Sequence, residues 1–190
     1  MLATELNSYC YSDMFSGCTA LTSSPELPAT TLAEYCYSNM FKNCTNLITM
    51  STLSATTLNN GCCSSMFSGC TSLTTVPVTL PATTLATGCY SSMFSGCTSL
   101  TTTPELPAIE LASNCYGYMF NGCTSLNYVK ALFTTTPSTS YTKNWLYNVA
   151  ASGTFVKNIN AEWTTTGING IPTGWTVETV DPESSDEITI

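Results

Sequence analysis

A repeat of about 26 residues constrains the fold of this chain more than any other feature. Five segments share one pattern, in which Met-Phe follows a cysteine after four residues and a second cysteine follows after eight. The repeated methionines are Met14, Met40, Met66, Met93 and Met119, which are evenly spaced except for one step that is longer by a single residue. The extra residue lies in the stretch 76–81, where a loop can absorb it. Tandem units of this length predict a stack in which each unit buries its apolar side chains against its neighbours.

Each unit is expected to contain two structural parts. In residues 89–97, the apolar side chains fall at i, i+4, i+5 and i+8, which is typical of one face of a helix or of a short helical turn. Residues 100–103 are rich in β-branched side chains and predict a short strand, which Pro104 ends because proline donates no hydrogen bond. We therefore predict an α/β solenoid of leucine-rich-repeat-like coils of about 26 residues. A short parallel sheet would cover one face, and short helices or turns the other.

The repeat pattern also suggests a domain organisation. Residues 1–149 are predicted to form the repeat solenoid, with five clear units and one degenerate unit. Residues 150–180 have the composition of strands and turns but a different sequence, as expected of a C-terminal cap that covers the end of a stack. Residues 181–190 are interpreted as an acidic tail or linker. Because residue 1 falls inside a unit, we expect the chain to be part of a longer protein or assembly.

The composition excludes several classes of function. The chain has four lysines, no arginine or histidine, and a net charge of −8, so it lacks the basic surface that nucleic-acid binding requires. Without histidine, it can form no Ser-His-Asp triad, no Cys-His dyad and no His-ligated metal site. We therefore predict no catalytic residues, no metal and no cofactor. No apolar run is long enough to span a bilayer, so direct membrane insertion is not expected.

Ten of the eleven cysteines fall into five Cys-x7-Cys pairs, and Cys63 is the odd one. In one interpretation they are buried thiols, which pack as small apolar side chains. In the other, each pair forms a disulfide within its coil, which requires the two Cα atoms to lie within about 7 Å. The chain would then have to turn back before the second cysteine. The pairs are Cys10 and Cys18, Cys36 and Cys44, Cys62 and Cys70, Cys89 and Cys97, and Cys115 and Cys123.

The segment Met93-Phe94-Ser-Gly96-Cys97-Thr-Ser-Leu100 and its four counterparts resemble the leucine-rich repeats of the BspA-like type. The resemblance covers about residues 1–149. The first cysteine of each unit departs from it, because the family has an aliphatic residue there. A second departure is the polar residue three positions after the leucine, as at Ser24 and Thr103, which weakens the predicted strand. The resemblance implies a secreted or surface-anchored binding protein, often an adhesin, but neither a ligand nor a catalytic residue.

Two rows of side chains are candidate binding surfaces. A tyrosine follows the first cysteine in four units, at Tyr11, Tyr37, Tyr90 and Tyr116. We favour packing between coils for this row over an aromatic surface for a glycan or protein. A threonine row on the predicted sheet face includes Thr75 and Thr102 and would offer a flat, uncharged recognition surface.

The sequence leads to two functional hypotheses. The first is a non-enzymatic recognition or adhesion module, extracellular or on the cell surface, that binds a host or environmental protein or glycan. The alternative is a structural spacer or appendage component, such as a part of a phage tail fibre, without its own ligand. A glycosidase is disfavoured because Glu26 and Glu105, at equivalent positions, lie three coils apart, too far for paired carboxylates to act on one bond.

Overall fold

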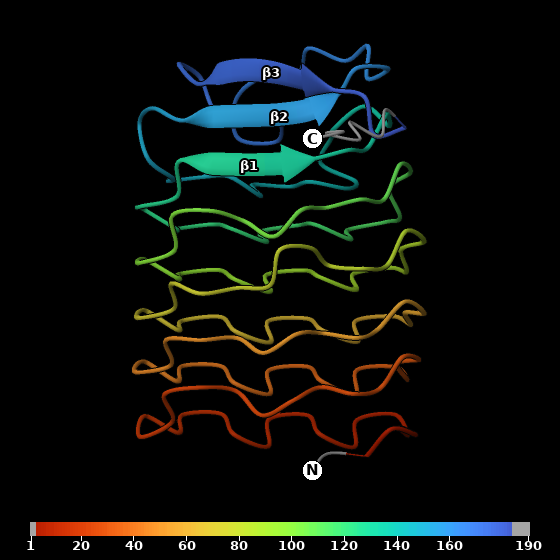
Figure 1. The fold of residues 1–190 in the computed structure, drawn as a ribbon, viewed down its shortest axis with the longest axis vertical. Helices are drawn as coiled ribbons and strands as arrows, with labels where there is room; N and C mark the ends of the chain where they lie inside the picture. Colours follow the sequence, from red (N-terminus) through yellow and green to blue (C-terminus); the bar gives the residue numbers. More distant parts are fainter. Residues whose placement is uncertain (1–2, 184–190) are drawn as a thin grey trace, which may run out of the picture.

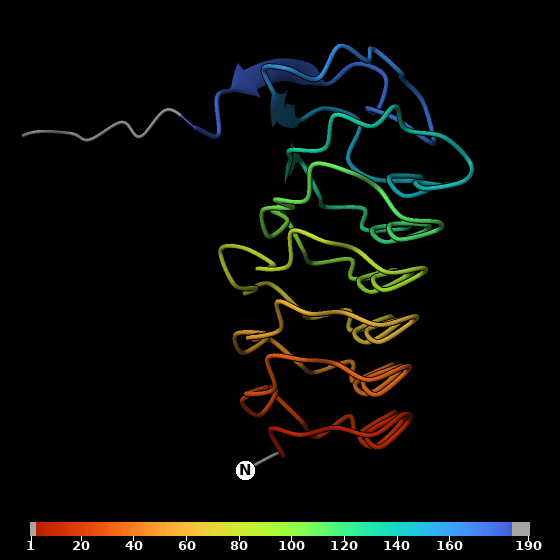
Figure 2. The ribbon, with the colours of Figure 1, turned by 90° about the vertical axis from the view of Figure 1, so that its right-hand side faces the viewer.

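The computed structural model describes residues 3–183 as a stack of coils. Successive units lie on top of one another from the N-terminal end to the C-terminal end (Figure 1, Figure 2). Three strands form at the C-terminal end of the stack: β1 (Tyr128–Ala131), β2 (Thr154–Asn158) and β3 (Thr176–Val180). They form one parallel sheet in the order β1-β2-β3.

The predicted α/β solenoid, with a short parallel sheet on one face and short helices or turns on the other, is wrong. Residues 3–183 contain no helix, and hence none long and apolar enough to cross a membrane. The sheet is confined to the three strands above. In the earlier coils, the predicted strand positions form only isolated parallel bridges, such as Ser23 with Thr49 and Thr49 with Thr75.

Proline explains why these bridges do not extend into strands. Pro25, Pro77 and Pro104 each stand two residues after a bridge position, and proline has no N–H to donate to the next rung. In the following coil this position is held by Lys130, and there the pairing with β2 continues over four residues. Continuous pairing therefore begins where two neighbouring coils both lack the proline, at Lys130 and Val156. The second coil has Ser51 at this position, but it lies between coils that carry Pro25 and Pro77.

A ribbon of successive turns replaces the predicted helix. Along the unit that begins near residue 35, every second N–H bonds three residues back, as from Ser38 to the Tyr35 carbonyl at 3.1 Å. The N–H groups between them donate to the next coil, as from Tyr37 to the Cys62 carbonyl at 2.9 Å. An α-helix would satisfy these donors internally, whereas this ribbon depends on a neighbouring coil for half of them.

The ribbon is not a helix because its backbone changes hand every four residues. Tyr35, Asn39 and Asn43 have φ angles of 50°, 54° and 60°, in the left-handed region that a right-handed helix excludes. The resulting repeat of four residues is close to the helical period of 3.6. Over nine residues, the spacing of apolar side chains therefore does not distinguish an α-helix from the turn ribbon. The third such position of each ribbon is held by Gly17, Asn43, Gly69, Gly96, Gly122 and Asn148, all with positive φ.

The core is a set of columns that run through the stack. Four of the five repeated methionines have no exposed surface, whereas Met14, in the first coil, is 54% exposed because it has a neighbouring coil on one side only. The phenylalanine that follows each methionine stacks on its counterpart, with ring centroids 5.1 to 5.8 Å apart. Each coil is therefore buried by its neighbours, as the repeat pattern predicts.

An aromatic cluster closes the C-terminal end. The Trp145 indole N–H donates to the Gly170 carbonyl at 2.9 Å, and that of Trp163 donates to the Phe133 carbonyl at 3.1 Å. Segment 150–180 supplies β2 and β3 and so continues the stack through the sheet. Residues 184–190 of the predicted acidic tail lie outside the described part of the chain.

The left-handed positions predict opposite effects of two substitutions in one ribbon. Gly96→Ala should lower the free energy of unfolding by about 1–2 kcal/mol, because an L side chain at φ 75° is strained. The added Cβ would meet the Gly69 backbone at 3.7 Å, an ordinary contact, so the strain is conformational. Ser92→Gly should raise stability by about 0.5–1 kcal/mol, since it relieves a serine at φ 56°. Urea unfolding measures the change in the free energy of unfolding for each variant. If the two changes had the same sign, the turn ribbon would be contradicted.

Candidate functional site

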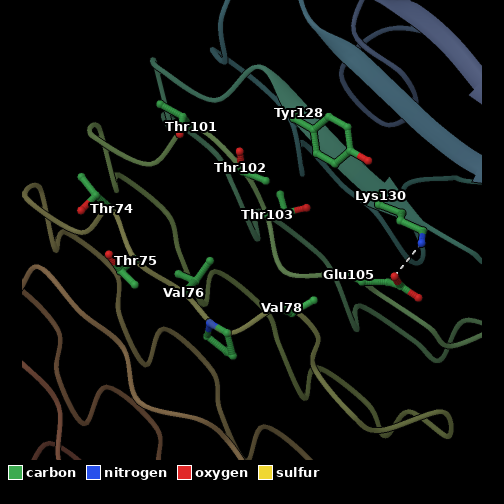
Figure 3. Close-up of a pocket in the computed structure, with 11 residues that line it drawn as sticks. Thr74, Thr75, Val76, Val78, Thr101, Thr102, Thr103, Glu105, Tyr128 and Lys130 are labelled. Atoms are coloured by element: carbon green, nitrogen blue, oxygen red, sulfur yellow. Dashed lines mark ion pairs between the residues drawn. The ribbon is translucent and has the colours of Figure 1, made fainter. Parts of the chain in front are cut away.

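A hollow lies on the face of the stack opposite the turn ribbons, where the third and fourth coils and β1 meet (Figure 3). Its cavity volume is about 510 Å³, within the range of small-molecule sites. The lining comes from residues 74–78, residues 101–103 with Glu105, and Tyr128 and Lys130 of β1. We call this hollow the ladder gap, because the bridges between coils are interrupted there.

The interruption is visible in the pattern of backbone pairing. Thr49 bridges Thr75, and Thr102 bridges Tyr128, but within residues 3–183 no bridge joins Thr75 to Thr102. At the equivalent step one coil earlier, the Met50 N–H donates to the Thr75 carbonyl at 2.8 Å. The equivalent donor here, the Val76 N–H, has no partner among the described residues.

The extra residue of the third unit causes the gap. Thr79 bridges Glu105 at the usual offset between coils, whereas Thr75 and Thr102 are separated by one residue more. Val78 is thus the residue without a counterpart, and it is 89% exposed. Its loop, yellow-green in Figure 2, reaches further out than those of the first two coils. The sequence located this insertion correctly but did not show that it separates two coils.

The lining carries hydroxyl groups and one ion pair. Thr75 and Thr102 are both exposed and lie on opposite sides of the gap. The Lys130 ammonium lies 2.7 Å from Oε2 of Glu105, with side chains 29% and 26% exposed. A partly exposed pair of this kind adds little stability, but it cancels the only charges that residues 3–183 contribute to the lining. The site therefore suits an uncharged ligand that forms hydrogen bonds.

The tyrosine row forms no binding surface, which corrects that candidate. Tyr37, Tyr90 and Tyr116 are at most 1% exposed, and Tyr11 is half-buried against the core. Tyr90 and Tyr116 stack with ring centroids 6.2 Å apart. The hydroxyls of Tyr37 and Tyr90 have no hydrogen-bond partner among the described residues, and burial raises the pKa of Tyr90 well above its usual range. These rings pack between coils.

Of the predicted surface residues, the structure brings Thr75 and Thr102 together at one site. Glu105, Tyr128 and Lys130 also line it, but sequence reasoning did not include them among the candidate binding residues. The available signal was the one longer step in the repeat, which marks the two coils whose threonines no longer pair. Lys130, the residue in place of the repeated proline, was a second signal.

The structure contains all eleven cysteines as free thiols, nine of them buried. From the second unit onward, the second cysteine donates its S–H to a phenylalanine carbonyl of the preceding coil, as from Cys97 to Phe67 at 3.2 Å and from Cys123 to Phe94 at 3.0 Å. A disulfide within a coil would remove these bonds. No group of three or more ligating side chains in residues 3–183 is arranged to hold a metal ion.

The buried thiols predict a loss of stability at high pH. Burial raises the pKa of Cys70 and Cys123 from 9.0 to about 12. As the pH rises, the unfolded chain therefore loses these protons before the folded chain does. The contribution of these thiols to the free energy of unfolding is fully present below pH 9 and is lost towards pH 12. Each thiol contributes up to about 1.4 kcal/mol per pH unit. Urea unfolding as a function of pH measures the slope.

Two cysteine variants control this experiment. Cys123→Val should make the slope shallower, and Val149 shows that valine is accepted at the equivalent position of the next unit. Cys18→Val should leave the slope unchanged because Cys18 is exposed. A stability that stays constant between pH 9 and 11 would contradict the buried thiols.

Comparisons with known proteins gave no match, whether to a family model, to a curated protein or to a solved structure. The resemblance to BspA-like repeats therefore stays a prediction. The function has to be argued from the geometry of the ladder gap.

Deleting Val78 should close the gap. The deletion restores the usual offset between coils, so that Val76 and Thr102 can pair across them. Two or three new backbone hydrogen bonds should raise the free energy of unfolding by about 1–3 kcal/mol. Urea unfolding measures this gain, and hydrogen exchange should show a newly protected Val76 amide. Val78→Ser keeps the insertion and should give neither effect. A deletion that destabilises the chain would show that the extra residue is not the cause.

Proposed function

We propose that this chain is a non-enzymatic recognition or adhesion module, located outside the cell or on its surface. Its ligand would be a host or environmental protein or glycan. The observation that carries the proposal is the ladder gap, where a one-residue insertion separates two coils and leaves backbone hydrogen-bonding groups without partners among the described residues. An interruption of this kind lowers the stability of the unliganded stack, because backbone hydrogen bonds between the coils are not made. A ligand that pairs with the exposed groups would recover part of this loss.

The surroundings of the gap support recognition more than catalysis. Glu105, the only carboxylate that the described part of the chain places in the lining, forms an ion pair with Lys130 at 2.7 Å. Glu26, the other member of the carboxylate pair considered above, lines a separate hollow.

Binding through the gap is tested by a matched pair of substitutions. Thr102→Val removes one hydroxyl from the gap while it preserves shape and strand propensity. Thr22→Val makes the same change on an exposed threonine of the first coil, remote from the gap. On arrays of immobilised extracellular-matrix proteins and glycans, Thr102→Val should weaken attachment about tenfold, equivalent to about 1.4 kcal/mol. Thr22→Val should bind like the unsubstituted chain.

The alternative function, a structural spacer, gives a different result in the same experiment. The hydrogen bonds from coil to coil and the continuous aromatic columns would make the stack a stiff connector. A spacer would show no attachment to any array member, and Thr102→Val and Thr22→Val would then differ only in stability. That outcome would reject the recognition module.

A further inference from the structure

We infer that the ladder gap binds a neutral sugar residue of a glycan. This inference rests on the proposed function and specifies the ligand class. It starts from the backbone groups that would pair across the gap in an uninterrupted stack. The donors are the N–H groups of Val76, Thr101 and Thr102, and the acceptors are the carbonyls of Thr74 and Thr102. None of these groups has a hydrogen-bond partner within the described chain.

Both kinds of group therefore border one small opening. A ligand that satisfies them has to donate and accept hydrogen bonds over short distances. A hydroxyl group does both, since it has one proton and two lone pairs. A sugar ring carries several hydroxyls at its rim, and the side chains of Thr75 and Thr102 add two more hydroxyls from the protein.

An inserted peptide strand does not fit the same opening. Coil-to-coil hydrogen bonds close the gap at both ends, from the Ser99 N–H to the Thr71 carbonyl at 3.2 Å and from the Glu105 N–H to the Val78 carbonyl at 2.8 Å. A strand between the two coils would need them about 9.6 Å apart, twice the usual spacing of about 4.8 Å. The coils stay close on the core side too, where the Phe67 and Phe94 rings lie 5.8 Å apart.

The walls of the gap match the two surfaces of a sugar. Val76, Pro77 and Val78 supply an apolar edge from the third coil. Tyr128 projects from β1 on the other side of residues 101–103 and is half-buried, so part of its ring is accessible (Figure 3). Apolar C–H groups of a sugar pack on such surfaces while its hydroxyls reach polar groups.

The charges favour a neutral sugar over an acidic one. Among the described residues, Glu105 and Lys130 are the only charged side chains that line the gap, and they neutralise each other at 2.7 Å. The pair presents a carboxylate acceptor beside an ammonium donor, both suited to hydroxyl groups. A sialylated or sulfated glycan would bring a negative charge that has no unpaired cation to meet it in this lining.

The test is titration calorimetry with neutral hexasaccharides as probes: cellohexaose, maltohexaose, mannohexaose and chitohexaose. At least one should bind the unsubstituted chain. Deletion of Val78 should reduce that affinity at least tenfold while it raises the free energy of unfolding, so the loss cannot be attributed to misfolding. Tyr128→Ala should also weaken binding about tenfold. Tyr147→Ala removes a tyrosine that is 53% exposed and lies outside the gap, and it should have no effect.

Several outcomes would overturn the inference. They are the absence of binding by all four hexasaccharides, binding that survives deletion of Val78, and tighter binding of sialyllactose or of a heparin hexasaccharide. If no sugar binds but attachment to a matrix protein depends on Thr102, the sugar assignment fails and the proposed function stands. If neither sugar nor protein binding depends on the gap, both fail.

Discussion

The hydrogen bond from one coil to the next is the interaction on which the rest of this structure depends. In the first five turn ribbons, alternate N–H groups find their acceptor only in the neighbouring coil, as from Phe41 to the Met66 carbonyl at 2.9 Å. A unit alone would leave half of these donors to water and its methionine and phenylalanine exposed. The stack is therefore the smallest stable structure, and the first coil shows the consequence in the exposure of Met14.

This dependence on register makes a one-residue insertion consequential. On the ribbon side, the third and fourth coils remain paired, as from the Cys63 N–H to the Cys89 carbonyl at 2.9 Å. On the opposite side, the extra Val78 moves Thr75 and Thr102 out of register. One wall of the stack is thus continuous while the other opens, and the opening is held between two rigid coils. If the hollow binds a ligand as proposed, it would be preorganised, because both walls are already part of the folded stack.

From the second to the fifth unit, the second cysteine is a small side chain that packs between closely stacked coils. The thiols of the second cysteine column fill space beside the phenylalanine columns and add a weak hydrogen bond to a carbonyl of the preceding coil. Valine can take the same place, as at position 149. The cysteines therefore act in the structure as packing groups. The pKa values of Cys70 and Cys123 rise because the stack excludes water from these thiols.

The sequence by itself determined the repeat, the stacking of units, the inward apolar positions, the place of the insertion and the threonines beside it. It also predicted a helix or a short helical turn where the chain forms a ribbon of turns with alternating hand, because periods of 3.6 and 4 residues give the same apolar spacing over nine residues. Only the tertiary structure decided that Tyr37 and Tyr90 are buried and that Glu105, Tyr128 and Lys130 meet the threonines. The physical reason is that pairing between coils, and its interruption beside the insertion, is a property of neighbouring units and not of any single one.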